Sequence, residues 1–495
     1  MKAEGDDSFF PRVTVQIPLY NEKFVVERII DAVAKLDYPS EKLQIQIIDD
    51  STDDSVAIAA GRIRFYKDQG LNISHVRRSK RTGYKAGALA DAMDGASGEF
   101  IAIFDADFIP APDFLGRSIA QFKDAKVGVV QSRWSYLNTK TNVLTRVQGV
   151  MLDAHFGVEQ TVRYQKNCFF NFNGTAGIWR RTAIEDAGGW SADTLTEDLD
   201  LSYRAQMKGW KFIYLNDLEC VSEIPTDMCA FKVQQHRWAK GSIEVMKKLL
   251  VPLWKSTVPL RVKIEASFHL TGNFSYMLMF IDSVFFLIPS VHIRENMDLN
   301  FIGWFDIPLF VLASLSHAWF FLYGQKILYG KMYDKLAIMP ILLATSIGLG
   351  VNNGRAVIEA LLGHVTGFER TPKVGEKTQI SQASQSSNST NSASRTGPQR
   401  YKALSTKWAD WLELSLALFY AVNLLWAIWE GYWVVTPFLL LFTLGFFYTG
   451  SLSILTRRRQ NKMIPAIKIP SDPKGVTSVT DSEDQAQQEA VKVIA

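Results

Sequence analysis

The feature that most constrains this chain is a change in character near residue 263. Before it, short β-rich runs alternate with helical patterns; after it come long apolar segments near residues 268–291, 302–323, 411–429 and 434–455. Each segment is about long enough to cross a hydrocarbon core of roughly 30 Å at about 1.5 Å per residue. A chain of 495 residues, 47% of them apolar, has room for one large soluble domain followed by such a membrane region.

The composition along the chain divides it further. A Ser, Gln, Asn and Thr-rich stretch at 377–399 cannot bury a core, so we expect it to be a disordered loop. The expected parts are a polar N-terminal segment at 1–10, a soluble domain at 11–228, interfacial helices at 229–262, a transmembrane region at 263–455, and a basic and then disordered tail at 456–495.

Loop charges predict the orientation of the membrane region. Basic loops at 326–335 and 457–462 alternate with acidic or short loops at 292–301 and 430–433, as the positive-inside rule requires. A further apolar run at 336–351 lies between two basic loops, so we interpret it as a re-entrant segment or a fifth span. The pattern predicts a multi-pass integral membrane protein with its soluble domain in the cytoplasm, as in the bacterial inner membrane or an equivalent.

Net charge, cysteines and the N-terminus exclude several classes of protein. The net charge of +4 is too small to predict nucleic-acid binding. Cys168, Cys220 and Cys229 lack the spacing of a zinc site or a disulfide framework. Residues 1–10 do not have the pattern of a signal peptide. These observations agree with a reduced, cytoplasmic soluble domain.

The soluble region predicts an α/β fold with a mostly parallel sheet. Strands are expected at 13–17, 44–48 and 99–104, with a helix at 24–36 between the first two. Acidic side chains follow two of these strands, at Asp49-Asp50 and at Asp105-Ala-Asp107. Ligands bind at the carboxyl edge of such sheets, so both groups of carboxylates are expected in one crevice.

Three motifs in this region have both a functional and a structural interpretation. Asp105 and Asp107 supply oxygen ligands for Mn²⁺ or Mg²⁺, although the same pair also suits a turn. Asp50 is placed to accept hydrogen bonds from a ribose or base, whereas Asp53 and Asp54 suit a helix cap. Lys85 lies among small residues, where it is either a diphosphate ligand or a solvated lysine.

Two later motifs complete the candidate site. Thr196-Glu-Asp198 precedes a helical pattern, so Thr196 suits an N-cap, and Asp198 suits a general base that takes a proton from an acceptor hydroxyl. Gln234-Gln-His-Arg-Trp238 lies in an amphipathic stretch whose lysines are expected to face lipid headgroups. Within it, Arg237 offers a planar fork to a diphosphate, and Trp238 offers a ring on which a sugar can stack.

These landmarks, in this order and followed by membrane helices, resemble the family 2 glycosyltransferases. The resemblance is dense over about residues 11–241. The motifs Val15-Gln-Ile-Pro-Leu-Tyr-Asn-Glu22, Gly83-Tyr-Lys-Ala-Gly87, Phe172-Asn-Gly-Thr-Ala-Gly177 and Gln234-Gln-His-Arg-Trp238 are similar to the cellulose-synthase-like A and C group, which makes mannan, glucomannan or β-glucan. The resemblance implies the GT-A type of nucleotide-sugar transferase fold.

The resemblance also implies roles for individual residues. Those expected to bind the nucleotide sugar are Pro18, Tyr20, Glu22, Asp50, Lys85, Asp105 and Arg237, with Asp105 and Asp107 as metal ligands and Asp198 as the base. Those expected at the acceptor are Phe172, Asn173, Gly174, Thr175, Glu197 and Trp238. The segment 368–373 resembles a gating loop, with Phe368, Thr371 and Lys373 as its characteristic residues.

The function implied is inverting, metal-dependent transfer of a hexose from a UDP- or GDP-sugar to a growing β-linked polysaccharide at the membrane. A single transfer to a lipid such as diacylglycerol or ceramide is the alternative, and it is favoured by the absence of membrane helices ahead of the soluble domain. The Gln-Gln-x-Arg-Trp and gating-loop motifs favour the polymer. A non-catalytic scaffold is expected to have lost an acidic landmark, and this chain keeps all three.

Overall fold

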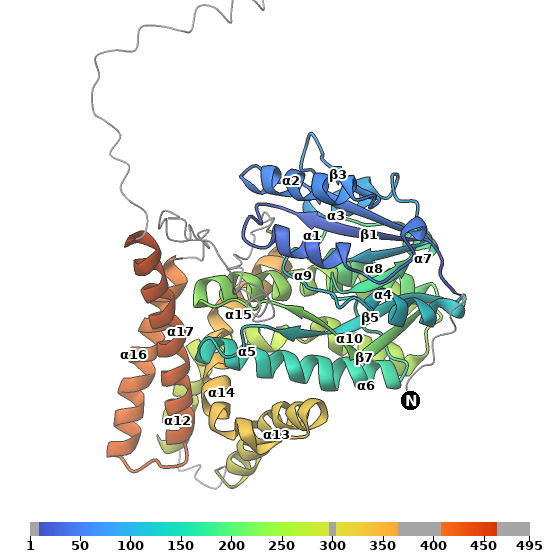
Figure 1. Ribbon diagram of the computed structural model, residues 1–495. Coiled ribbons are helices and arrows are strands. Elements are labelled where there is room, and N and C mark those ends of the chain that lie inside the picture. The colour runs from blue at the N-terminus through green and yellow to red at the C-terminus, as the bar shows by residue number, and fades with distance from the viewer. Residues whose placement is uncertain (1–8, 297–302, 365–406, 463–495) are drawn as a thin grey trace, which may run out of the picture. The chain divides into compact units, whose positions relative to one another are not determined.

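A seven-stranded mixed sheet forms the centre of the N-terminal half (Figure 1). The computed structural model describes residues 9–296, 303–364 and 407–462. The strands, in the spatial order β3-β2-β1-β4-β6-β5-β7, are β3 (Ile73–Val76), β2 (Leu43–Asp49), β1 (Val13–Leu19), β4 (Phe100–Ile103), β6 (Gly177–Arg180), β5 (Val127–Tyr136) and β7 (Lys211–Ser222). Strand β6 is antiparallel to both of its neighbours, and the other four pairings are parallel.

This sheet confirms the expected α/β class with mostly parallel strands. The predicted strands at 13–17, 44–48 and 99–104 correspond to β1, β2 and β4, and the predicted helix at 24–36 corresponds to α1. The observed bounds differ by a few residues at most, as expected where helix and strand ends fray.

Helices cover both faces of the sheet because its strands are apolar on both sides. Along β4, Phe100 and Ala102 belong to one buried cluster, whereas Ile101 and Ile103 belong to the cluster on the opposite face. The first cluster also contains residues of α1 (Val26–Ala34), α2 (Ser55–Asp68) and α4 (Phe114–Ile119). The second contains residues of α3 (Tyr84–Ala92), η3 (His155–Gln160), α7 (Arg181–Asp186) and α8 (Glu197–Met207).

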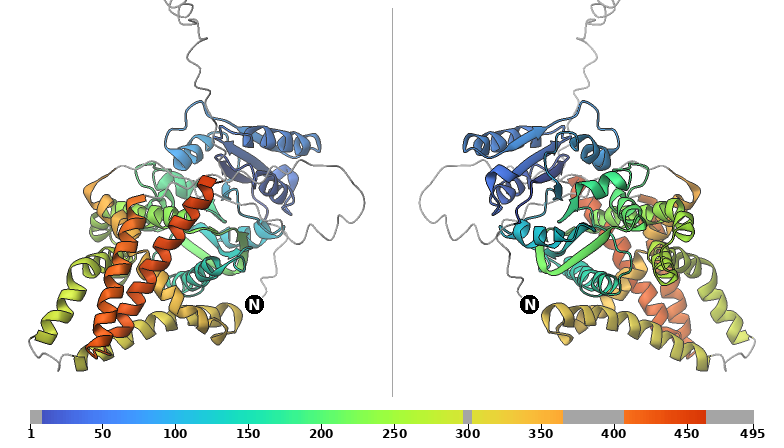
Figure 2. Two further views of the ribbon diagram at one scale, coloured as in Figure 1. Left: turned by 90° about the vertical axis from the view of Figure 1, so that its left-hand side faces the viewer. Right: turned by 90° about the vertical axis from the view of Figure 1, so that its right-hand side faces the viewer.

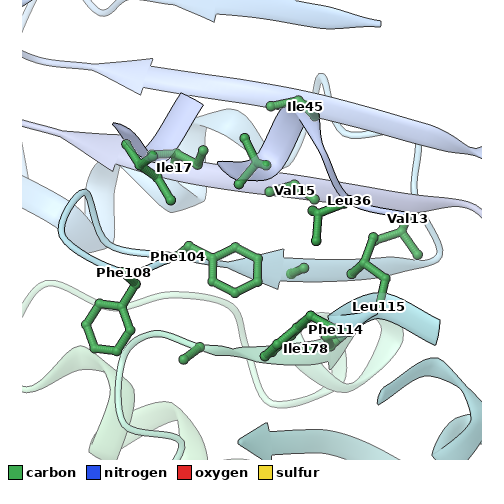
Figure 3. Close-up of a cluster of buried hydrophobic side chains, with 14 of the residues drawn as sticks. Val13, Val15, Ile17, Leu36, Ile45, Phe104, Phe108, Phe114, Leu115 and Ile178 are labelled. Atoms are coloured by element: carbon green, nitrogen blue, oxygen red, sulfur yellow. The ribbon is translucent and has the colours of Figure 1, made fainter. Parts of the chain in front are cut away.

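Figure 3 shows part of the first cluster, which fixes the strand that carries the predicted metal ligands. Val13, Val15 and Ile17 of β1 lie on the same side of the sheet as Phe104, which follows β4. The Phe104 ring meets that of Phe114 edge to face, with 5.0 Å between centroids. Residue 104 is therefore held in the core immediately before Asp105.

The remaining elements of the N-terminal half are short helices and one longer helix. They are η1 (Ser40–Lys42), η2 (Ala120–Lys123), α5 (Val143–Ala154) and α6 (Thr161–Gln165).

The described part of the chain after β7 is helical. Its elements are α9 (Met228–Lys255), α10 (Leu260–Thr271), α11 (Phe274–Ile281), η4 (Asp282–Phe286), α12 (Leu287–Asn296), α13 (Gly303–Tyr329), η6 (Tyr333–Ile338), α14 (Met339–Gly348), α15 (Gly350–Leu362), α16 (Lys407–Trp429) and α17 (Thr436–Lys462). Helices α16 and α17 lie side by side (Figures 1 and 2), where Tyr420 stacks on Phe442 at 5.0 Å between centroids.

Three described helices are long and apolar enough to span a membrane: Tyr333–Leu362, Lys407–Trp429 and Thr436–Gln460. A fourth span is possible if Leu260–Thr271 and Phe274–Ser290, which meet at a 51° bend, act together. The predicted span at 302–323 corresponds to α13, whose Phe321 and Leu322 pack on Val147 and Val150 of α5. The predicted loop at 377–399, the gating-loop residues Phe368, Thr371 and Lys373, and the predicted disordered tail lie outside the described residues.

Candidate active site

The topology of the sheet brings the candidate residues to one edge. Strands β1, β2 and β4 are parallel neighbours, so Tyr20, Asp50 and Asp105 leave the sheet at the same edge. Strand β6 runs the other way, and its first residue, Gly177, pairs with Ile103 at the end of β4. The segment that leads into β6 therefore begins beside Asp105. A cavity of about 190 Å³ opens at this edge.

Lys85 connects the residue pair that follows β4 with the segment that leads into β6. Its Nζ lies 2.5 Å from Oδ1 of Asp105 and donates to the carbonyl of Gly174 at 2.8 Å. The backbone N–H of Asp105 donates to Oγ1 of Thr175 at 2.8 Å. Burial opposes the charge on Lys85, but the carboxylates of Asp105 and Glu197 outweigh it and raise the Lys85 pKa. Lys85 is therefore a charged side chain of the cavity wall, which excludes the interpretation as a solvated lysine.

Asp198 enters the cavity from the first turn of α8. A Cβ atom added at Gly174 would lie 2.9 Å from Oδ2 of Asp198 and 3.6 Å from Nζ of Lys85, so the backbone at Gly174 passes close to both side chains. Burial, together with the neighbouring charge of Glu197, raises the pKa of Asp198 to about 7, and Lys85 opposes this rise. A carboxylate with such a pKa holds a proton much better than an exposed aspartate, as a general base must.

The N-cap position of α8 is occupied by Thr196, as predicted, but its side chain makes no capping hydrogen bond. The helix is connected to the cavity segment instead through Ser202. Its Oγ accepts from the N–H of Phe172 at 2.9 Å and donates to the carbonyl of Asp198 at 2.6 Å. This connection holds Asp198 in register with the segment that carries Gly174.

Helix α9 brings Arg237 and Trp238 to the same cavity. Strand β7 runs parallel to β5 and ends at this edge, and α9 begins six residues later at Met228, capped by Asp227. Burial lowers the pKa of Arg237, and nearby carboxylates oppose this effect. Those carboxylates are Glu197, Asp105, Asp198 and Asp107, and all four line the cavity.

Arginines that the sequence interpretation missed lie at the predicted nucleotide end of the cavity. Arg78 holds both oxygens of Asp50, at 3.0 and 2.6 Å, so this carboxylate is fixed by a bidentate pair. The guanidinium of Arg81 lies 3.4 Å from the ring centroid of Tyr20. The signal was visible in the basic run 77–81, which follows β3 at the same sheet edge.

Asp49 and Asp50 differ although they are adjacent. Asp49 is buried and lies 2.9 Å from Nε2 of His75, while the N–H of Ser51 donates to it at 2.8 Å. Asp50 follows the strand and lines the cavity. Asp53 accepts from the N–H of Ser55 at 3.0 Å, in agreement with its interpretation as a structural residue near the start of α2.

Most of the candidate residues meet in this one cavity. It is lined by Pro18, Tyr20, Glu22, Asp50, Lys85, Asp105, Asp107, Asn173, Gly174, Glu197, Asp198, Arg237 and Trp238. Phe172 and Thr175, predicted to contact the acceptor, do not line it, because Phe172 packs on Trp179 in the core and Thr175 supports the backbone of Asp105. Arg81, Tyr84, Trp134 and Tyr136 line it without having been predicted.

The acidic groups offer an incomplete set of metal ligands. Within the described residues, no group of three or more His, Cys, Asp or Glu side chains is arranged to hold a metal ion. Asp105 and Asp107 are nevertheless close enough in the chain to share a cation, and the Asp105 side chain is 36% exposed. Two carboxylates fit a divalent cation that takes its other ligands from a diphosphate.

The expectation that the lysines of α9 face lipid headgroups is wrong for two of them. Lys232 and Lys240 are 1% and 0% exposed. Nζ of Lys232 lies 2.6 Å from Glu413 and 3.2 Å from Asp410, both in α16. Nζ of Lys240 donates to the carbonyl of His364 at 2.5 Å. The helix is covered by helices from later in the chain, which its local amphipathic pattern could not reveal.

Comparisons with known proteins find a matching family model and similar proteins. Residues 11–241 match the family model described as glycosyltransferase-like family 2. The chain is 43% identical over 275 residues to glucomannan 4-beta-mannosyltransferase 1 of Oryza sativa subsp. japonica, a match that covers 54% of this chain and 52% of that protein. It is 45% identical over 255 residues to glucomannan 4-beta-mannosyltransferase 2 of Arabidopsis thaliana, covering 50% and 48%. The chain thus spans about half the length of these curated relatives.

Among solved structures, a mannosyltransferase of Pyrobaculum calidifontis in complex with GDP-Man and Mn²⁺ aligns with a TM-score of 0.46 and 19% identity, over 73% of this chain and 90% of that one. The family match covers the residues that build the sheet, the carboxylate edge and the first part of α9. The domain formed by residues 11–241 therefore belongs to glycosyltransferase-like family 2.

Proposed function

We propose that this protein transfers a hexose from a nucleotide diphosphate sugar to a growing β-linked polysaccharide at a membrane, with inversion at the anomeric carbon. The observation that carries the proposal is the convergence of Asp105, Lys85 and Asp198 around the backbone of Gly174, with Arg237 in the same cavity. The names of the relatives, glucomannan 4-beta-mannosyltransferases, suggest mannose as the sugar and a β-1,4-linked mannan or glucomannan as the product.

The donor's diphosphate would lie between the carboxylate edge and α9. Lys85 and Arg237 supply positive charge there, and Asp105 and Asp107 would hold a divalent cation, Mn²⁺ or Mg²⁺, which neutralises charge on the leaving nucleotide. Asp50, held by Arg78, and the Arg81-Tyr20 stack would bind the nucleoside. The nucleotide in this proposal is UDP or GDP.

Asp198 would act as the base. Its carboxylate takes the proton of the acceptor hydroxyl as that oxygen attacks the anomeric carbon and the nucleotide diphosphate leaves. A single base without a covalent intermediate gives inversion of configuration. Glu197, Asn173 and Trp238 would surround the acceptor sugar, with Trp238 stacking on its ring.

The membrane is part of the proposal. Three described helices are long enough to span it, and the basic loops predict that the catalytic domain faces the cytoplasm. Membrane lipids and a polysaccharide acceptor are therefore the expected partners. The glycolipid alternative shares the donor site, but the names of the relatives favour the polymer.

The experiment supplies purified protein in bilayers with labelled GDP-mannose, UDP-glucose or UDP-galactose, each with Mn²⁺, Mg²⁺ or a chelator. We expect metal-dependent label from GDP-mannose in an insoluble product that an endo-β-1,4-mannanase releases. The Asp198→Asn variant is the control for contaminating transferases. Label that partitions into organic solvent would contradict a polymer product. Transfer that persists in the chelator would contradict the metal dependence.

A further inference from the structure

Helix α9 presents different residues to the cavity and to the helices that cover it. Arg237 and Trp238 line the cavity, whereas His236 and Lys240 approach α15. Positions 236 and 240 are one helical turn apart and so lie on the same face of the helix. The two cavity residues are thus flanked in sequence by two cationic or ionisable side chains that both reach one neighbouring helix.

A single carboxylate of α15 receives both side chains. Oε2 of Glu359 lies 3.1 Å from Nε2 of His236 and 3.7 Å from Nζ of Lys240. Its other oxygen, Oε1, accepts from Nε of Arg355 at 2.6 Å. Lys240 is fully buried, and the side chains of Glu359 and His236 are 19% and 16% exposed. Ion pairs that are largely shielded from solvent in this way are screened little by salt.

We propose that Glu359 is a positioning residue for the transfer reaction, because it fixes the rotation of α9 and so aims Arg237 and Trp238 into the cavity. The roles of those two residues rest on the proposed function. A carboxylate that holds positions 236 and 240 from one side sets the rotation of the helix about its axis. Arg237, the next residue, then has one direction in which to extend.

The neighbouring contacts between α9 and α15 explain why this role is separable from folding. Nζ of Lys247 donates to the carbonyls of Ala360 and Leu361 at 2.9 and 3.0 Å, and Nδ2 of Asn352 donates to the carbonyl of Lys232 at 2.9 Å. These hydrogen bonds hold the two helices together without Glu359. Loss of the Glu359 charge should therefore leave the rotation of α9 less well fixed, while the packing of α9 on α15 stays in place.

The test compares Glu359→Gln with the native full chain in detergent or bilayers, and it measures the affinity for GDP and for UDP with Mn²⁺ by calorimetry. We expect nucleotide affinity to weaken by roughly tenfold, with the KM for the donor sugar rising in the same proportion. The unfolding temperature should remain close to that of the native protein. Equal affinity in the two proteins would overturn the proposal.

Glu185→Gln is the matched control. Glu185 also pairs with an arginine four residues away, since Nε of Arg181 lies 2.8 Å from its Oε1, but it does not line the cavity. This variant should bind nucleotide like the native protein. If it weakened binding as much as Glu359→Gln, the effect would come from the loss of any arginine–glutamate pair, and the proposal would fail.

A double-mutant cycle with His236→Gln separates positioning from independent losses. If Glu359 acts through its contact with His236, the double variant should bind nucleotide about as weakly as Glu359→Gln alone. Full additivity of the two effects would count against the proposal. Nucleotide binding without any sugar transfer by the native protein would contradict the proposed function, yet it would leave this comparison of affinities valid.

Discussion

Two acidic clusters in this protein use the same side chains for opposite purposes. In the cavity, Asp105, Asp107, Glu197 and Asp198 gather around two cations, and several of them remain partly exposed. Between α9 and α16, Asp410 and Glu413 have side chains that are 2% and 0% exposed. The second cluster is closed by Lys232, whereas the first is open to a ligand.

The difference shows how a functional cluster can be recognised among structural ones. Buried carboxylates paired with a buried lysine belong to the packing of helices, because ligands cannot reach them. Carboxylates at a sheet edge that outnumber the cations around them need further positive charge, which a metal ion and a diphosphate can share. The clusters should therefore respond differently to mutation, and four predictions test this difference.

The largest effect is expected from Asp198→Asn. Removal of the proposed base should lower the transfer rate by about 10²–10⁴-fold, because the acceptor hydroxyl then keeps its proton. Initial rates with labelled GDP-mannose and a mannan oligosaccharide measure this loss. Calorimetry should show nucleotide affinity close to native. A native transfer rate in this variant would exclude Asp198 as the base.

In the buried cluster of Lys232, Asp410 and Glu413, the Lys232→Met variant should lower the stability of the protein. It leaves Asp410 and Glu413 buried without their cation, which costs about 3–5 kcal/mol of unfolding free energy. Thermal unfolding of the detergent-solubilised protein measures this effect. Lys208→Met removes an exposed pair with Asp186, whose side chains are 56% and 45% exposed, and should cost about 0–1 kcal/mol.

A triple variant sharpens this prediction. When Asp410→Asn and Glu413→Gln are combined with Lys232→Met, no buried charge is left without a partner, so most of the lost stability should return. If the triple variant is as unstable as Lys232→Met alone, the charges are not the cause of the instability.

Gly174→Ala tests how closely the backbone approaches Asp198 in the cavity cluster. Gly174 has φ +78°, and an added Cβ would lie 2.9 Å from Oδ2 of Asp198. The left-handed conformation alone costs an alanine about 1–2 kcal/mol. We expect a comparable loss of stability together with a loss of transfer of about tenfold or more, because the methyl group displaces Asp198.

Gly189→Ala separates strain from contact. Gly189 has φ +74° but no atom within 4 Å of an added Cβ. It should lose stability to a similar degree and keep its transfer rate per folded molecule. Equal loss of transfer in both alanine variants would show that strain, and not contact with Asp198, lowers the rate.

The smallest effect is a shift in pH dependence. Asp198 must be deprotonated to act as a base, and its pKa of about 7 predicts that the transfer rate rises with pH through about 7. Glu197 contributes to raising this pKa, so Glu197→Gln should move the rise to lower pH. Lys85 lowers it, so Lys85→Met should move the rise to higher pH. Initial rates between about pH 5 and 9 measure both shifts, and shifts in the same direction would contradict this assignment.

The sheet was predictable because its signals are local. Strands β1, β2 and β4 are apolar runs, and acidic residues stand at the end of β2 and just after β4; such local patterns are visible without knowing the neighbours of the strands. The antiparallel strand β6 gave no comparable signal. Its four residues acquire their place by pairing with β4 and β5, and these pairings join residues far apart in the chain.

The candidate site was partly predictable for the same reason. Asp105, Asp107 and Asp198 belong to short motifs, whereas the pairing of Arg78 with Asp50 joins side chains from different strand ends. Phe172 illustrates the opposite error, since it belongs to a motif that resembles an acceptor site but its ring packs in the core. Sequence motifs identify a segment, and only the fold decides which of its side chains face the cavity.

The sequence by itself determined the α/β class, the order of a soluble and an apolar region, and the carboxylates that follow the strands. These properties depend on periodicity and spacing within short windows. Only the tertiary structure decided that Lys232 and Lys240 turn away from solvent, that Glu359 meets His236, and that Gly174 passes beside Asp198. Each of these contacts depends on burial and charge supplied by a distant segment, so no local pattern could specify it.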